Sequence, residues 1–138
     1  ESSPGVETAF QVTDIPFPML LDEAQMQQAI LNLMANASDA MGGKGRIDLR
    51  LGREGEDVVL EVADNGPGMG DDVKAHAFEP FFTTKRGGQG HGLGLAITRQ
   101  LVQRNGGRIE LYSRLGEGTT FRLRFPVSPA VATKTQEV

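Results

Sequence analysis

The spacing of apolar residues predicts two amphipathic helices. In the first, apolar residues recur at the i, i+3, i+4 and i+7 positions of one helical face, Asp22 is placed to cap the N-terminus, and Gly42-Gly43 ends the helix. The apolar positions of this face are Met26, Ala29, Ile30, Leu33, Ala37, Ala40 and Met41. A second helix is expected over residues 93–105, before the stop formed by residues 105–107. Its apolar stripe consists of Leu93, Ala96, Ile97 and Leu101.

Alternating apolar and polar residues predict five short strands. They cover residues 8–13, 46–52, 58–64, 108–113 and 119–125, and the second and third of them form a hairpin. Asp71 or Asp72 is expected to cap a short helix, and residues 78–92, which have no sustained period, to form a long loop. The order of the elements predicts an α+β fold, a two-layer α/β sandwich with the helices on one face of a mixed, mostly antiparallel sheet.

Composition limits the classes of protein to which the chain can belong. Its 138 residues, 38% hydrophobic and 23% charged, are typical of one globular domain. The absence of cysteine excludes a disulfide framework and cysteine-ligated zinc, and two histidines do not make a metal cluster. With no apolar run of about 18 residues and no basic start followed by an apolar stretch, neither a membrane anchor nor a signal peptide is expected. A net charge of −4 argues against binding to nucleic acid.

Two asparagines in the first helix form one candidate site. Asn32 and Asn36 stand four residues apart, so both amides point from one face, and Asp39 lies near that face. Neutral side-chain oxygens of this kind can ligate a Mg²⁺ ion to which negatively charged phosphates are already bound. The alternative, that all three are solvated surface residues, stays open on the sequence.

Two glycine-rich segments form the other candidates. The segment Asp-Asn-Gly-Pro-Gly at 64–68 follows a predicted strand, where the Asp64 carboxylate can accept from an exocyclic amino group while the glycines let a flat ring approach. A β-turn capped by aspartate is the alternative. The segment 90–95 runs directly into the second helix, whose first N–H groups suit a phosphate, and a simple turn is the alternative.

Five segments in this order resemble the ATP-binding catalytic domain of sensor histidine kinases, within the group that also includes gyrase, Hsp90, MutL and the anti-sigma serine kinases. The F-box sequence Phe-Glu-Pro-Phe-Phe-Thr-Thr-Lys most resembles kinases of the nitrogen-regulation kind. The resemblance covers residues 8–126 and implies the Bergerat fold, with 1–7 as a frayed N-terminus and 127–138 as a disordered tail or linker. The matching segments are the N box (32–37), the first glycine box (64–68), the F box (78–85), the second glycine box (90–95) and the last box (118–121).

The resemblance also implies roles for individual residues. Asn36 would coordinate Mg²⁺, with Asn32 beside it as the second catalytic residue, and Asp64 would accept from the adenine amino group. Phosphates would be bound beneath a lid formed by residues 79–91, through the backbone N–H groups of Gly90, Gly92, Leu93 and Gly94. The other implied nucleotide-binding positions are Asp39, Gly66, Gly68, Met69, Phe78, Thr83, Thr84, Lys85, His91, Leu95 and Thr119. Asp39 stands where many such kinases carry a basic residue, and His91 where a small polar residue is usual, so their phosphate contacts stay open.

The same resemblance indicates phosphoryl transfer rather than hydrolysis. ATP-hydrolysing relatives place a glutamate at the position of Asn32 as the base that activates water, and an amide cannot take that proton. Neither His76 nor His91 lies in a phosphoacceptor setting, so the acceptor is expected upstream, on the kinase's own dimerisation and phosphoacceptor domain. A response regulator receiver domain is the expected indirect partner.

These implications predict a cytoplasmic domain that uses ATP and Mg²⁺, without direct membrane contact, whether or not the intact protein is membrane-anchored. Two other functions stay open: a serine kinase that acts on a separate protein, and a nucleotide-gated binding module that transfers no phosphate.

Overall fold

The computed structural model describes residues 5–12, 22–80 and 94–126. Its elements follow the predicted order of a strand, a helix, two strands, a short helix, a helix and two strands. They are β1 (Val6–Val12), α1 (Glu23–Ala40), β2 (Gly45–Glu54), β3 (Asp57–Asp64), α2 (Asp71–His76), α3 (Gly94–Arg104), β4 (Arg108–Ser113) and β5 (Thr119–Pro126).

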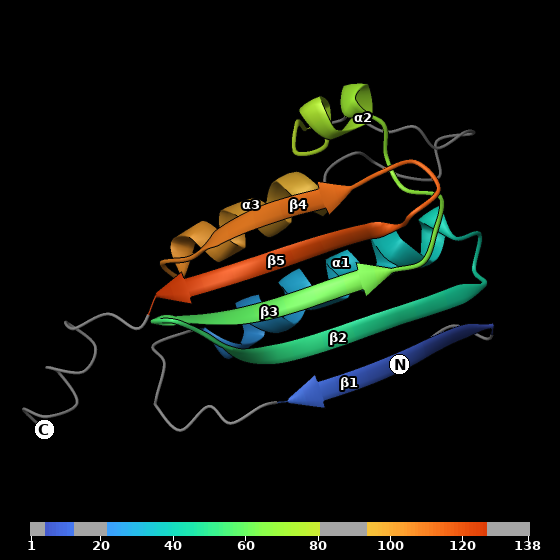
Figure 1. Ribbon diagram of the computed structural model, residues 1–138. Helices are drawn as coiled ribbons and strands as arrows, with labels where there is room; N and C mark the ends of the chain where they lie inside the picture. Colours follow the sequence, from blue (N-terminus) through green and yellow to red (C-terminus); the bar gives the residue numbers. More distant parts are fainter. Residues whose placement is uncertain (1–4, 13–21, 81–93, 127–138) are drawn as a thin grey trace, which may run out of the picture.

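The five strands form one mixed sheet in the order β1-β2-β3-β5-β4. β1 runs parallel to β2, and the other neighbouring strands are antiparallel, including the predicted β2–β3 hairpin. Figure 1 shows α1 and α3 on the same face of this sheet, and the two helices contact each other. The predicted two-layer sandwich, with helices on one face of a mostly antiparallel sheet, is therefore confirmed.

The core lies between the sheet and the helices because alternate strand residues point toward the helix layer. On β5, Phe121, Leu123 and Phe125 are buried, whereas Arg122 and Arg124 occupy the alternate positions. The helices contribute buried residues spaced along one face of each, namely Ala29, Leu33, Ala37, Leu101 and Val102. One face of the sheet is thus apolar and covered, and the other is charged.

Asp22 and a pair of glycines set the two ends of α1, as the sequence predicts. The Asp22 Oδ1 accepts from the Gln25 N–H at 2.9 Å, which satisfies one of the free donors of the first turn. At the other end, Gly42 and Gly43 have φ angles of 68° and 78°. Glycine adopts this left-handed conformation readily, and it ends the helix.

Two element ends differ from the prediction. β1 begins at Val6 rather than at Thr8, so the buried Val6 belongs to the sheet and not to a frayed end. The short helix α2 has Gly70 as its N-cap, and Asp71 and Asp72 lie inside its first turn. Carboxylates in a first turn interact with the positive end of the helix dipole, so these aspartates favour the helix without capping it.

The buried stripe of α3 also differs from the predicted one. Ile97 is 40% exposed, whereas Thr98 and Val102 are completely buried. Thr98 can be buried because its Oγ1 donates to the Gly94 carbonyl at 2.7 Å, which satisfies the hydroxyl. A stripe drawn through apolar residues alone omits such a threonine, and it wrongly places Ile97 in the core.

Hydrogen bonds of the Asn105 side chain connect the end of α3 to the start of α1. Its Oδ1 accepts from the Asp22 N–H at 2.7 Å, and its Nδ2 donates to Gln25 Oε1 at 2.9 Å and to the Leu101 carbonyl at 2.7 Å. Asn105→Ala is expected to lower the free energy of unfolding by about 1–3 kcal/mol, because it leaves these partners without their hydrogen bonds.

Urea denaturation measures this loss directly. Gln103→Ala, at an exposed position in the last turn of α3, is the matched control and should change the free energy of unfolding by less than about 0.5 kcal/mol. If Asn105→Ala were as stable as this control, Asn105 would not be a link between the two helices.

Candidate functional site

At one end of the sheet, three positions on the side that faces the core hold polar rather than apolar residues. Asp64, at the end of β3, is paired in register with Thr119 at the start of β5, and Thr119 is paired in turn with Ser113 at the end of β4. Two positions further into each strand, the same register holds the core residues Val62, Phe121 and Leu111. The three residues, called the polar row below, therefore lie on the helix-facing side of the sheet.

Asp64 brings an ionisable group to the polar row. Its Oδ1 accepts from the Gly66 N–H at 2.8 Å, so the aspartate does cap the turn that follows β3. Burial raises the pKa of Asp64, and the backbone N–H groups of Gly66 and Thr119 lower it in part. An ionised carboxylate has about four acceptor positions, so it can cap this turn and still accept from an exocyclic amino group.

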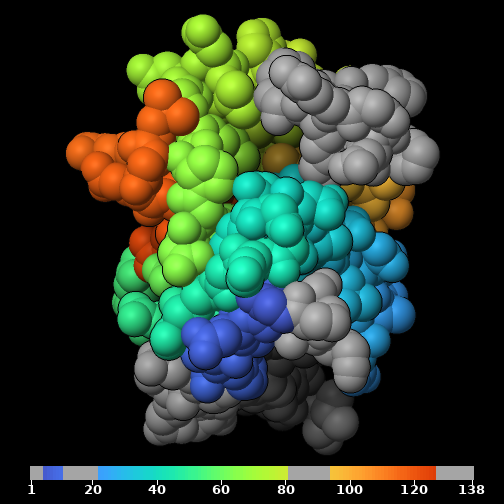
Figure 2. All heavy atoms as spheres, turned by 90° about the vertical axis from the view of Figure 1, so that its right-hand side faces the viewer, coloured from blue at the N-terminus to red at the C-terminus, as the bar shows by residue number. Residues whose placement is uncertain are grey.

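The glycines beside Asp64 are required by packing within the protein. Gly68 has a φ of +77°, and a Cβ there would lie 1.9 Å from the Arg114 carbonyl oxygen. Gly118 has a φ of +86°, and a Cβ there would lie 2.1 Å from the Asp64 carbonyl oxygen. Figure 2 faces this end of the molecule and shows the segment after β3 in green, between the β4–β5 turn in orange and the end of α1 in cyan. The β4–β5 turn is thus pressed against the Asp64 segment.

The asparagines of α1 lie at the border of its buried face. Asn32 and Asn36 are each partly exposed, and the residue that follows each of them is buried. The Asn32 Oδ1 accepts from Gln28 Nε2 at 2.8 Å. Asp39, one turn further along, is exposed. The two amides are therefore neither core residues nor fully solvated ones.

The C-terminal end of α1 lies against the segment that follows β3. A Cβ on Gly66 would lie 2.9 Å from Met41 Cγ, which shows how closely the helix end approaches this segment. Figure 1 shows the same end of α1 beside the end of β3. The half of α1 that carries Asn36 and Asp39 is therefore at the same end of the sandwich as Asp64.

Met69 and Phe78, two further predicted positions, are partly buried against the core. The Phe78 ring meets Phe121 edge-on with centroids 6.2 Å apart, and the Arg99 guanidinium carbon lies 5.3 Å from the Phe78 centroid. The Met69 N–H donates to Ser113 Oγ at 2.8 Å. An aromatic contact thus holds the start of the predicted long loop, as the sequence indicates.

Gly94 and Leu95 begin α3, so a helix follows the second glycine-rich segment as predicted. Within residues 5–12, 22–80 and 94–126, no group of three or more histidines, cysteines and carboxylates is arranged to hold a metal ion. No helix of the same residues has the length and apolar character to span a membrane. The predicted positions that lie outside the described residues are Thr83, Thr84, Lys85, Gly90, His91, Gly92 and Leu93.

Ser113 and Lys74 are not singled out by the sequence, although both hold this end of the molecule together. The Ser113 Oγ lies 2.9 Å from the Gly118 carbonyl oxygen and 2.8 Å from Thr119 Oγ1. Lys74 Nζ, on α2, donates to the Ser113 carbonyl at 2.8 Å. The sequence does contain one indication that Ser113 is buried. It occupies an inward-facing position of β4, and the two preceding inward-facing positions of that strand are apolar.

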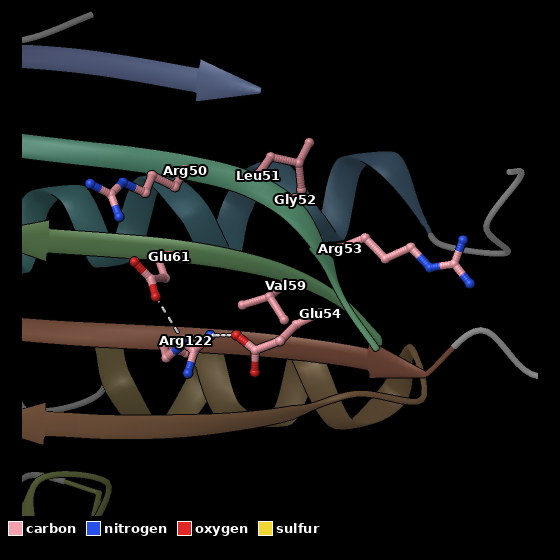
Figure 3. Close-up of a pocket in the computed structure, with 8 residues that line it drawn as sticks. All are labelled: Arg50, Leu51, Gly52, Arg53, Glu54, Val59, Glu61 and Arg122. Carbon is pink, nitrogen blue, oxygen red and sulfur yellow. Dashed lines mark hydrogen bonds and ion pairs between the residues drawn. The ribbon is translucent and has the colours of Figure 1, made fainter. Parts of the chain in front are cut away.

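A hollow on the charged face of the sheet is a weaker candidate. Figure 3 shows the residues that line it, which are Arg50, Leu51, Gly52, Arg53, Glu54, Val59, Glu61 and Arg122. Arg122 pairs with Glu61, at 2.9 Å between Nε and Oε2, and with Glu54. Hydrogen bonds from Arg124 and Arg122 lower the pKa of Glu54. Since these charges already neutralise one another, the polar row is the better candidate for ligand binding.

Known proteins similar to this chain point to one family. The family model described as histidine kinase-, DNA gyrase B-, and HSP90-like ATPase matches residues 21–129. The C4-dicarboxylate transport sensor protein DctB of Pseudomonas aeruginosa is 40% identical over 137 residues, and the match covers 96% of this chain. The chain spans 22% of the length of that curated relative.

Solved structures agree with this result. The catalytic domain of the histidine kinase ThkA matches with a TM-score of 0.77 and 31% identity, over 91% of this chain and 82% of that one. The histidine kinase ThkA in complex with the response regulator protein TrrA matches with a TM-score of 0.72 and 28% identity, over 91% of this chain and 35% of that one.

Proposed function

Because the chain belongs to the family of histidine kinase-, DNA gyrase B- and HSP90-like ATPases, we propose that it is the ATP-binding catalytic domain of a two-component sensor histidine kinase. It binds ATP with Mg²⁺ and donates the γ-phosphoryl group to a histidine on a separate dimerisation and phosphoacceptor domain. The observation that carries this proposal is Asp64, a partly buried carboxylate at the end of β3 beside glycines that leave no room for a side chain.

In this function, Asp64 accepts a hydrogen bond from the exocyclic amino group of adenine. Its surroundings support that role, because burial makes the ionised carboxylate depend on hydrogen-bond donors and an adenine amino group is one. Residues near Asp64 in the sequence or paired with it in register complete the base-binding end of the site. They are Thr119, Gly66, Gly68 and Met69.

Asn36 supplies a side-chain oxygen to Mg²⁺, and Asn32 lies one turn before it on the phosphate side. The partly exposed amides fit this role, because Mg²⁺ prefers oxygen ligands and keeps several of its waters. A Mg²⁺ ion held by Asn36 would stabilise the negative charge that develops on the phosphates during transfer. Asp39, on the same end of α1, is proposed as a further contact near the phosphates.

The phosphates bind at the N-terminal end of α3, where unpaired N–H groups and the helix dipole favour an anion. Gly94 and Leu95 contribute from the described part of that helix. The backbone of 90–93 and the side chains of Phe78, Thr83, Thr84, Lys85 and His91 are proposed to complete the phosphate site and the lid.

Transfer to an outside nucleophile is favoured over hydrolysis by the residue at position 32. Asn32 carries an amide, which accepts from Gln28 in the structure and cannot take a proton from water. An activated water is the nucleophile that hydrolysis needs, whereas a phosphoacceptor histidine brings its own lone pair. The domain is therefore suited to phosphoryl transfer rather than to ATP hydrolysis.

Two partners follow from this proposal. The first is the kinase's own dimerisation and phosphoacceptor domain, and the second is a response regulator, in line with the ThkA structure in complex with TrrA. The F-box sequence at 78–85 supports a kinase of the nitrogen-regulation kind, whereas the matched relative DctB is a sensor for C4-dicarboxylate transport. A cytoplasmic location is part of the same proposal.

The magnesium role of Asn36 can be tested by calorimetry with and without the metal. Asn36→Ala is expected to weaken binding of ATP in the presence of Mg²⁺ by about 1–2 kcal/mol, roughly tenfold, because one oxygen ligand is lost. Binding of ADP without metal should change by less than about twofold, because no metal ligand is involved. Ala35→Ser, at the exposed neighbouring position, is the control and should change neither value. Equal losses with and without Mg²⁺ would exclude Asn36 as a metal ligand.

A further inference from the structure

The Ser113 hydroxyl lies at the centre of three contacts in the polar row. It receives the Met69 N–H at 2.8 Å, and it lies 2.9 Å from the Gly118 carbonyl oxygen and 2.8 Å from Thr119 Oγ1. Both hydroxyl-bearing residues are buried, Ser113 being 8% and Thr119 5% exposed. Buried hydroxyls of this kind are held in one arrangement rather than rotating freely.

The protons available on each group determine the direction of these hydrogen bonds. A serine hydroxyl has one proton to donate and two lone pairs to accept with. The Met69 N–H can only donate and the Gly118 carbonyl can only accept, so the single Ser113 proton goes to Gly118. The remaining contact is satisfied only if Thr119 donates its hydroxyl proton to Ser113.

Thr119 therefore directs only lone pairs toward any ligand, because its proton is held by Ser113. The neighbouring residue in register on the same face is Asp64, whose carboxylate is also an acceptor. Two acceptors side by side suit a ligand that presents hydrogen-bond donors and disfavour one that presents an oxygen.

We propose that Ser113 is a positioning residue that sets base selectivity, by holding the Thr119 proton so that this end of the site accepts the 6-amino group of adenine and rejects a 6-oxo purine. The inference rests on the proposed nucleotide-binding function. Ser113 itself touches no nucleotide and acts through Thr119.

The test compares binding of ATP and ITP, whose purines differ at position 6, where ATP has an amino group and ITP an oxygen, and at N1, which carries a proton only in ITP. Ser113→Ala frees the Thr119 hydroxyl to rotate and donate to the 6-oxo group, so the ratio of ITP to ATP dissociation constants is expected to fall by roughly five- to tenfold. If Ser113 only held the Asp64 segment in place, its removal would weaken binding of both nucleotides by the same factor. An unchanged ratio would overturn the inference.

Three further variants complete the experiment. Ser113→Thr keeps the hydroxyl and should restore the native ratio, and Glu117→Ala, at an exposed position of the same turn, should leave it unchanged. If Ser113→Ala does not fold, Ser113→Cys keeps the volume with a weaker donor and acceptor, and its ratio should fall by a smaller factor; a native ratio in Ser113→Cys would overturn the inference.

The outcomes also separate this inference from the proposed function. A native chain that binds neither ATP nor ITP contradicts both. A native chain that prefers ATP, with a preference lost in Asp64→Asn but retained in Ser113→Ala, contradicts only the role of Ser113.

Discussion

Gly68→Ala is expected to lower the free energy of unfolding by about 3 kcal/mol or more, the largest loss that we predict for a single methyl group. Two causes add. The φ of +77° is a left-handed conformation that costs a residue with a Cβ about 1–2 kcal/mol. The new Cβ would also lie 1.9 Å from the Arg114 carbonyl oxygen, and since that oxygen belongs to the backbone, it can move only if the β4–β5 turn moves.

Gly116→Ala is the matched control for this substitution. Gly116 has a similar φ of +82°, but a Cβ there would meet nothing within 4 Å among the described residues beyond its chain neighbours, so only the conformational cost applies. The free energies of unfolding of the two variants, measured by thermal or urea denaturation, should therefore differ by about 1–2 kcal/mol or more. Two equally destabilised variants would mean that the turn is not pressed against the Asp64 segment.

Asp64→Asn is expected to weaken binding of ATP and ADP by about 1.5–3 kcal/mol, which is roughly 10- to 150-fold. Asparagine keeps the shape of the side chain, but it loses the charge that strengthens the hydrogen bond to the adenine amino group. Burial raises the pKa of Asp64, so the fold disfavours its ionised form and should lose little stability when the charge is removed. Affinity and stability therefore respond differently, which distinguishes a binding residue from a structural one.

Calorimetric titration with ADP measures the change in affinity. Asp57→Asn is the control, because Asp57 lies at the other end of β3, 3.4 Å from Arg124 Nη1, and should leave affinity unchanged. If Asp64→Asn bound ADP as the native chain does, the adenine site would lie elsewhere.

The raised pKa of Asp64 also predicts how affinity depends on pH. The ionised carboxylate is the better acceptor, so affinity should be constant above this pKa and should fall as the pH drops through it. Because burial raises the pKa, the fall begins at a higher pH than for an exposed aspartate. Asp64→Asn should remove this part of the pH dependence.

Patterns of apolar residues predicted the elements and layers of the fold because periodicity depends directly on local geometry. The exceptions are residues whose burial depends on a partner. Thr98 is buried because Gly94 accepts its hydroxyl proton, and hydropathy alone cannot show this. Ile97 is exposed because the packing face of α3 includes Thr98 and Val102.

The position of the candidate site was predictable where a family motif marks it, and not where strand register alone brings residues together. Asp64 lies at the end of β3, as predicted. The structure adds that the half of α1 that carries Asn36 lies at the same end of the sandwich. Ser113 has no motif, and its importance follows only from its register with Thr119 and from the approach of Met69. The binding roles of Asp64, Asn32, Asn36 and the residues of 81–93 stay predictions.

Incubation of this domain with γ-labelled ATP, Mg²⁺ and a separately produced phosphoacceptor domain of the kinase tests the central claim most directly. The label should appear on the acceptor domain in a bond that is labile to acid and stable to base, as phosphohistidine is. This chain alone should bind nucleotide and carry no label, on His76, His91 or any other residue. Label in an acid-stable and base-labile bond would indicate a serine kinase, nucleotide binding without any transfer would indicate a binding module, and either result would contradict the proposed function.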